Sequence, residues 1–172
     1  MKKNEAAKDL AGFANVSAIS EKLAETKAAL NQSVADLYVA RVAIHQVHWY
    51  MRGAGFMVWH PKMDEYMDTI DEYLDEMSER LITLGGAPYS TSVEFAEVSG
   101  IKEVPGEFKN VEESLARVLD IFRYLVALFQ KGMDISDEEG DSVTNSLFED
   151  AKGDLEKTIW MLTAELGQAP GL

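Results

Sequence analysis

The stretch MDEYMDTIDEYLDEMSERLITLGGAP, residues 63–88, has the most regular helical pattern of the chain. Its apolar side chains recur at spacings of three and four residues, which places them on one face of an α-helix. Gly85 and Gly86, with Pro88 just beyond them, are typical of a helix end. The stretch therefore predicts a long amphipathic helix whose buried face comprises Met63, Met67, Ile70, Leu74, Met77, Leu81 and Leu84.

Three further stretches have the same apolar spacing. Residues 23–51 predict a helix that ends at the glycines of positions 53 and 55. A third helix is expected to begin after Asn110 and to end before Gly132. The fourth is predicted to begin at the capping-box pattern Ser136-x-x-Glu139 and to end at Gly167.

The connection between the second and third helices, of about 25 residues, is longer than most linkers in compact domains. Within it, Thr91-x-x-Glu94 predicts a capping box that opens a short helix, which Gly100 closes. No segment alternates in the way that a strand requires. The predicted fold is all-α: a ferritin-like four-helix bundle with a short extra helix in the long crossover between helices 2 and 3.

The composition of the chain excludes several functional classes. Its 172 residues are typical of one domain, and 30 acidic against 16 basic residues give a formal net charge of −14. Such a charge repels nucleic acids and anionic membranes. There is no cysteine, which excludes disulfides and thiolate ligands. No apolar run approaches the ~18 residues of a membrane span, so we expect a cytoplasmic protein without a membrane partner.

Two pairs of potential metal ligands lie on the second helix. His60 and Asp64 are four residues apart, as are Asp75 and Glu79, so that each pair lies on one helical face. The pairs are separated by roughly 16 Å at ~1.5 Å per residue, too far for one metal ion. Two antiparallel copies of the helix can be related by a two-fold axis near residues 69 and 70. The His60 and Asp64 pair of one copy would then lie beside the Asp75 and Glu79 pair of the other.

His48, set in the apolar stripe of the first helix, would add a second imidazole to this site. Imidazole and carboxylate together suit iron, zinc or manganese rather than calcium. The alternatives are ordinary ones: a histidine on an apolar stripe is often a core residue, and a run of acids is often a solvated helix face. The intrachain di-iron site of ferritin-like bundles requires Glu-x-x-His on two helices, and that motif is absent.

Three strings carry a family resemblance: HxxHWYMRGxGFxxxHPKMDEY from position 45, LDEMSERLITLGGAPYST from position 74, and DEEGDSVTN from position 137. They resemble the Dps family of mini-ferritins, and most closely its streptococcal Dps-like peroxide resistance proteins. The resemblance implies a bundle domain over residues 26–172, preceded by a flexible amino-terminal segment at residues 1–25. It also implies a hollow homododecamer with ferroxidase centres at its two-fold interfaces.

The resemblance further assigns roles to individual residues. One subunit supplies the iron ligands His48, His60 and Asp64, and its neighbour supplies Asp75 and Glu79. Trp49 matches a tryptophan near the iron and has packing as its alternative role. The remaining assignments are mineral nucleation for Glu65 and Asp68, and the lining of a three-fold pore for Asp137 and Asp141. The pore pattern is incomplete, because Ser142 and Ser146 stand where some relatives have aspartate.

The implied function is iron storage and detoxification. Hydrogen peroxide would oxidise ferrous iron, Fe(II), at the shared sites, and the ferric product, Fe(III), would be stored as a mineral, which gives resistance to peroxide. Two alternatives are a DNA-coating nucleoid protein and a structural site in which zinc or manganese joins subunits without redox chemistry. The five lysines up to Lys27 are offset by four acids on a strongly acidic chain, so we expect no DNA binding at physiological salt.

Overall fold

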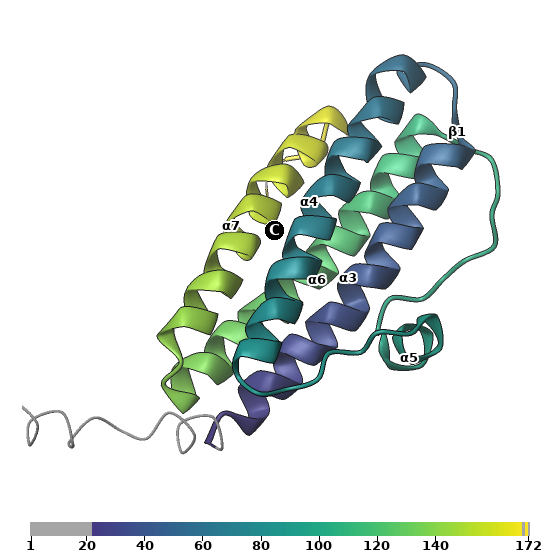
Figure 1. Cartoon of the computed structure of the whole chain (residues 1–172). Coiled ribbons are helices and arrows are strands. Elements are labelled where there is room, and N and C mark those ends of the chain that lie inside the picture. Colours follow the sequence, from purple (N-terminus) through teal and green to yellow (C-terminus); the bar gives the residue numbers. More distant parts are fainter. Residues whose placement is uncertain (1–21, 170, 172) are drawn as a thin grey trace, which may run out of the picture.

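The computed structural model, which describes residues 22–169 and 171, is built around four long helices (Figure 1). They are α3 (Ala24–Tyr50), α4 (Phe56–Thr83), α6 (Val111–Glu139) and α7 (Ser142–Glu165). Helix α3 packs against α4 and α6, and α6 packs against α7. Their apolar faces form one core, and the predicted all-α bundle is confirmed. Its fully buried side chains include Leu37, Ile44, Met63, Ile70, Phe122, Phe129 and Phe148.

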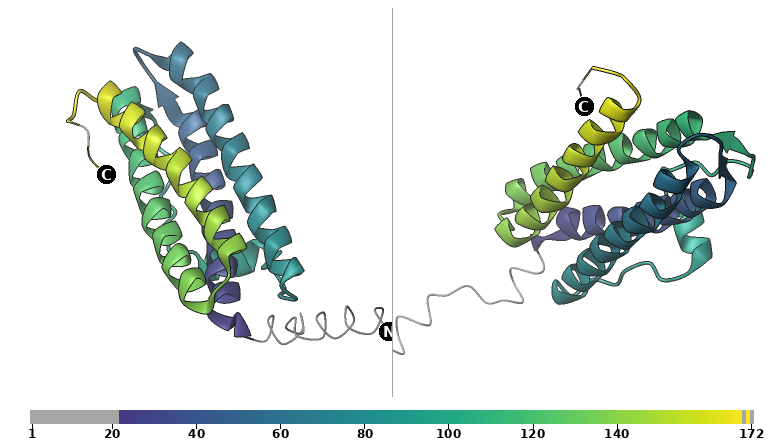
Figure 2. Two further views of the ribbon diagram at one scale, coloured as in Figure 1. Left: turned by 90° about the vertical axis from the view of Figure 1, so that its left-hand side faces the viewer. Right: turned by 90° about the horizontal axis from the view of Figure 1, so that it is seen from above.

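The short helix α5 (Ser92–Val98) lies outside the four-helix bundle and packs against α3 (Figures 1 and 2). Thr91 caps it as predicted: its hydroxyl accepts a hydrogen bond from the backbone N–H of Glu94, whose carboxylate accepts one from the N–H of Thr91. The prediction that no strand is present is wrong. The two-residue strands β1 (Met51–Arg52) and β2 (Lys109–Asn110) pair in parallel and join the end of α3 to the start of α6.

The boundary between α6 and α7 also differs from the prediction. Helix α6 continues through Gly132 to Glu139, and it ends where Gly140 adopts the left-handed conformation, with φ of 78°. Ser136 lies inside α6, and its buried hydroxyl donates to the carbonyl of Gly132 at 2.8 Å. A serine that bonds back into its own helix in this way does not start a new one. The residue that caps α7 is Asp141.

The Glu139 carboxylate does not form the predicted capping box with Ser136 but binds the start of α3. It accepts hydrogen bonds from the backbone N–H groups of Glu25 and Thr26, at 3.2 and 2.7 Å. These are donors of the first turn of α3, which have no partner within the helix. Of the predicted flexible segment, residues 1–21 lie outside the described residues, whereas Leu23 is buried in the core. Among the described residues, no helix is long and apolar enough to cross a membrane.

Candidate metal centre

His48 of α3 and His60 of α4 face each other across the junction of the two helices. Their rings stack with centroids 3.7 Å apart. Nδ1 of His48 lies 2.9 Å from the carbonyl oxygen of His60, and Nδ1 of His60 lies 3.0 Å from that of His48. Because a carbonyl oxygen only accepts hydrogen bonds, each Nδ1 carries the proton in the neutral ring. Each Nε2 therefore keeps its lone pair, and Nε2 is the atom through which such a ring binds a metal ion.

Asp64 is the third side chain of this group. One of its carboxylate oxygens is 3.5 Å from Nδ1 of His48, and its side chain is 59% exposed, against 12% for His48. Phe56 stacks on the other side of His60, with centroids 4.7 Å apart. Gly55, at φ 86°, provides the sharp turn that starts α4 at Phe56. The histidines are thus held by packing and by backbone contacts, whereas Asp64 faces solvent.

Asp75 and Glu79 lie farther along α4, and both are exposed. Within the described part of the chain, neither carboxylate makes a hydrogen bond or an ion pair. The offset of eleven residues from Asp64 to Asp75 spans roughly 16 Å of helix, as predicted. Among residues 22–169 and 171, no group of three or more histidines and acids has the geometry to hold a metal ion. One chain therefore presents two incomplete ligand sets.

Trp49 is 62% exposed, so packing in the core is not its role. Its ring lies against that of His45, with centroids 3.9 Å apart. Burial lowers the pKa of the His45 imidazole, and the nearby charge of Arg41 lowers it further. The His45 ring in turn lies edge-on to that of His48, with centroids 5.9 Å apart, so that Trp49 is linked to the histidine pair through His45.

The ion pair of Arg41 and Asp71 also lies between α3 and α4. It was not predicted from the sequence. The Nε group of Arg41 donates to the Asp71 carboxylate at 2.7 Å. This hydrogen bond raises the pKa of Arg41. The pair is formed by an isolated base on α3 and one acid of a long run on α4, and nothing in their sequence positions alone predicts the contact.

The two predicted pore residues have different surroundings. Asp141 is 7% exposed and accepts two hydrogen bonds from Arg80, at 2.7 and 2.9 Å. Burial alone would raise the pKa of Asp141, but hydrogen bonds from Thr144 and Arg80 outweigh it and lower the pKa. Asp137 is exposed and lies in the last turn of α6, not in the first turn of α7 as predicted. Only Asp137 is therefore available to solvent.

The two predicted nucleation residues are both exposed on α4. Glu65 forms an ion pair with Lys62, and its backbone carbonyl accepts a hydrogen bond from Thr69. The Asp68 carboxylate lies close enough to Arg41 for its negative charge to help raise the pKa of Arg41. The structure thus places the two carboxylates in different electrostatic surroundings.

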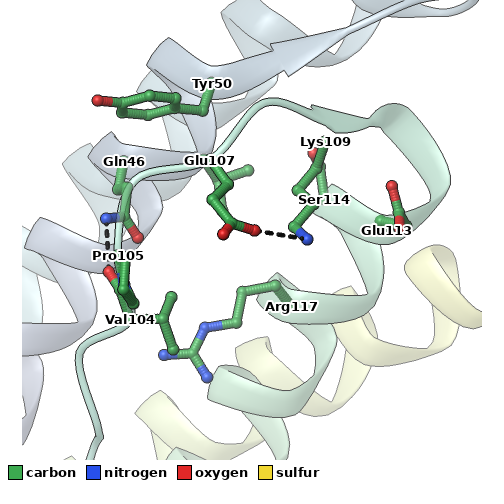
Figure 3. A pocket seen from close by; sticks show the side chains of 10 residues that line it. Gln46, Tyr50, Val104, Pro105, Glu107, Lys109, Glu113, Ser114 and Arg117 are labelled. Carbon is green, nitrogen blue, oxygen red and sulfur yellow. Dashed lines mark hydrogen bonds and ion pairs between the residues drawn. The ribbon is translucent and has the colours of Figure 1, made fainter.

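A separate surface pocket of about 210 Å³ lies between α3, the crossover and the start of α6 (Figure 3). Its polar groups largely satisfy one another. Gln46 donates to the carbonyl of Val104 at 2.9 Å, Lys109 pairs with Glu107 at 3.1 Å, and Arg117 donates to a crossover carbonyl. These mutual pairs leave no set of ligands that resembles the histidine group, and we assign no function to this pocket.

Comparison with known proteins identifies the family. Residues 27–172 match the ferritin-like domain. A Streptococcus suis protein named DNA protection during starvation protein is 70% identical over 151 residues, 87% of this chain and 88% of that protein. The Listeria monocytogenes protein of that name is 41% identical, over 85% of this chain and 94% of its own length. The chain belongs to the Dps family of ferritin-like proteins.

Solved Dps structures agree with this identification. The X-ray structure of Dps from Listeria monocytogenes matches with a TM-score of 0.82 at 41% identity, over 84% of this chain and 95% of that one. Dps from Listeria innocua soaked with zinc matches with a TM-score of 0.81. The predicted resemblance and the ferritin-like fold are thereby confirmed. At the level of the family, Dps proteins serve iron storage and protection against stress.

Proposed function

We propose that this Dps-family chain is a ferroxidase that detoxifies and stores iron, with each oxidation site shared by two subunits. Two α4 helices would pair antiparallel, so that His48, His60 and Asp64 of one chain face the partner subunit's Asp75 and Glu79. The observation that carries the proposal is the pair of incomplete ligand sets: two imidazoles with free Nε2 atoms at one end of α4, and two unpaired carboxylates at the other.

The ligand chemistry supports oxidation of ferrous iron. Neutral imidazoles bind the ferrous ion, and carboxylates stabilise the ferric product. Hydrogen peroxide accepts one electron from each of two ferrous ions; its O–O bond breaks, and two hydroxide ions form. Because both electrons are delivered at one site, no hydroxyl radical is released. The ferric product would then be stored as an oxyhydroxide mineral inside a dodecameric shell.

The remaining sequence predictions become part of this proposal. The exposed ring of Trp49, which contacts His45 next to His48, suits a role beside the reacting iron. Glu65 and Asp68 are the candidates for mineral nucleation. Of the two predicted pore residues, Asp137 is the better candidate for drawing cations inward, because Asp141 is buried against Arg80.

A peroxide assay with matched variants tests the proposal. Metal-free protein receives two ferrous ions per subunit without oxygen, followed by stoichiometric peroxide, while near-ultraviolet absorbance reports ferric products. We expect peroxide to oxidise the iron much faster than air does, and Glu79→Ala to slow the reaction at least about 100-fold. Glu76→Ala, one exposed acid on the same helix, should behave like the wild type.

Oxidation by wild-type protein no faster than in buffer would refute the ferroxidase. If zinc or manganese bound at the same ligands while iron was not oxidised, the structural metal site would replace it, because zinc has no redox chemistry. Zinc added before iron should otherwise inhibit the reaction by occupying the same ligands.

DNA coating is the second candidate, since the curated relatives are named for DNA protection. The formal charge of −14 per chain argues against it, because duplex binding depends on many cationic contacts with phosphate. We predict no retardation of duplex DNA in a gel at ~150 mM salt. A retarded band that persisted at this salt concentration would show that the chain binds DNA despite its net charge.

A further inference from the structure

Arg41 has hydrogen-bonding capacity that its own chain does not use. Its Nε lies 2.6 and 2.7 Å from the two oxygens of Asp71, and the two side chains are 39% and 42% exposed. In the described part of the chain, neither Nη group makes a hydrogen bond. The guanidinium therefore presents its remaining N–H donors to solvent on the face of α3 and α4 that also carries the iron ligands.

The proposed function pairs the α4 helices of two subunits antiparallel, and this pairing determines which residues of the partner subunit cover this face. If His60 faces the partner subunit's Glu79, and Asp64 the partner's Asp75, the two-fold axis passes between Thr69 and Ile70. Asp71 follows this axis by the same number of residues as Asp68 precedes it. Asp71 of one chain therefore faces the partner subunit's Asp68.

This geometry creates an electrostatic problem at the centre of the interface. Two Asp68 and two Asp71 carboxylates meet around the axis, between the two iron sites, and like charges brought together across an interface are strongly unfavourable. Arg41 enters the centre from α3, already fixed to Asp71 by Nε. Its planar fork of donors matches the geometry of a second carboxylate, which a lysine ammonium would not reproduce.

We propose that Arg41 is a positioning residue of the subunit interface. Its Nε holds Asp71 of its own chain, and its Nη groups bind the partner subunit's Asp68, so that two acidic α4 helices approach closely enough to complete both iron sites. The inference rests on the shared site of the proposed function. It assigns Asp68 to the interface and leaves Glu65 as the candidate for mineral nucleation.

Association of the metal-free protein tests this role independently of iron chemistry. Sedimentation velocity with a chelator present, at 50 and 500 mM salt (about 14 and 4 Å of screening length), would compare wild type with Arg41→Gln. We expect association of Arg41→Gln to be weaker by at least about tenfold at low salt and to recover at high salt. Lys131→Gln, which removes an exposed positive charge from α6, is the matched control and should associate normally.

A second substitution separates a cross-chain contact from a structural role. Adding Asp68→Asn to Arg41→Gln should restore association at low salt, because it removes the unpaired carboxylates, whereas adding Glu65→Gln should not. Circular dichroism confirms that each variant is helical. Wild-type association by Arg41→Gln at low salt, or a defect that neither salt nor Asp68→Asn relieves, would overturn the assignment.

Iron oxidation measured on the same samples distinguishes this inference from the proposed function. If wild-type protein assembles and oxidises iron, but Arg41→Gln assembles equally well, only the role of Arg41 fails. If wild-type protein neither assembles nor oxidises iron, the shared site itself fails.

Discussion

At the scale of single residues, the histidine pair shows how the fold sets the chemistry of a side chain. The reciprocal contacts of His48 and His60 with each other's backbone carbonyl fix which ring nitrogen carries the proton. Spacing in the sequence predicted that these residues are candidate ligands. It did not predict their tautomers, because the contacts join residues of two different helices. The free Nε2 atoms follow from the packing of α3 against α4.

Asp141 leads to a prediction about pH and stability. Replacing it with alanine removes the N-cap of α7 and leaves Arg80 without its buried carboxylate, so we expect a loss of about 3 kcal/mol in the free energy of unfolding near pH 7. Urea denaturation at fixed protein concentration measures this loss. Asp150→Ala, an exposed acid of α7 without such a partner, is the control.

The effect of Asp141→Ala should depend on pH in a definite direction. The pKa of Asp141 is lowered in the folded protein, so the unfolded chain takes up a proton there first as the solution is acidified. The stabilisation by Asp141 is therefore full above about pH 5 and declines as the pH falls below about 4. A difference between wild type and variant that stayed constant from pH 7 to pH 3 would show that the ionised Asp141 carboxylate is not the source of the stabilisation.

At the scale of elements, a buried aspartate fastens the long crossover to the bundle. Asp36 of α3 is fully buried, and its carboxylate accepts hydrogen bonds from the Ser99 hydroxyl, the Gly100 N–H and the Tyr124 hydroxyl, at 2.7, 2.7 and 3.0 Å. Gly100 is required here, because a Cβ would lie 2.1 Å from the Tyr124 hydroxyl oxygen. One carboxylate thus joins α3, the end of α5 and α6.

We predict that Asp36→Ala costs about 2–4 kcal/mol in the free energy of unfolding, because several buried donors lose their acceptor. The crossover after α5 should also become sensitive to limited proteolysis, which mass spectrometry of the fragments would locate near residues 99–106. Asp120→Ala, an exposed acid on α6, should change neither property. Unchanged proteolysis in Asp36→Ala would show that other contacts hold the crossover.

Local signals predicted some elements well and failed at others for a physical reason. Thr91 with Glu94, and Asn110 with Glu113, form the capping boxes that their spacing indicates. Ser136 and Glu139 have the same spacing but form no capping box. The Glu139 carboxylate instead accepts a hydrogen bond from the backbone N–H of Thr26, which is 113 residues earlier in the chain. A capping pattern identifies a local hydrogen bond that a glutamate is able to form. Whether Glu139 forms it depends on tertiary packing, which here places the start of α3 beside the end of α6.

At the scale of the whole molecule, the separation of ligand pairs on α4 argues for an assembly. Sequence spacing alone predicted that His60 and Asp64 lie too far from Asp75 and Glu79 to share an ion within one chain, and both pairs lie on the continuous helix α4. The proposed contribution of Arg41 to the interface could not be predicted in this way. Its contact with Asp71 depends on how two helices pack.

The most direct test of the shared site is complementation between two inactive variants. His48→Ala and Asp75→Ala are purified separately, dissociated, mixed in equal amounts and reassembled, with subunit exchange verified by native mass spectrometry. A dimer with one subunit of each kind has one site with both substitutions and one intact site. Random pairing should therefore restore about a quarter of the wild-type sites.

The measured quantity is peroxide-driven iron oxidation per subunit, compared with each variant alone. We expect recovery to about one quarter of wild-type activity in the mixture, and no recovery when either variant is reassembled with itself. Verified mixing without any recovery would show that the iron ligands do not come from two chains.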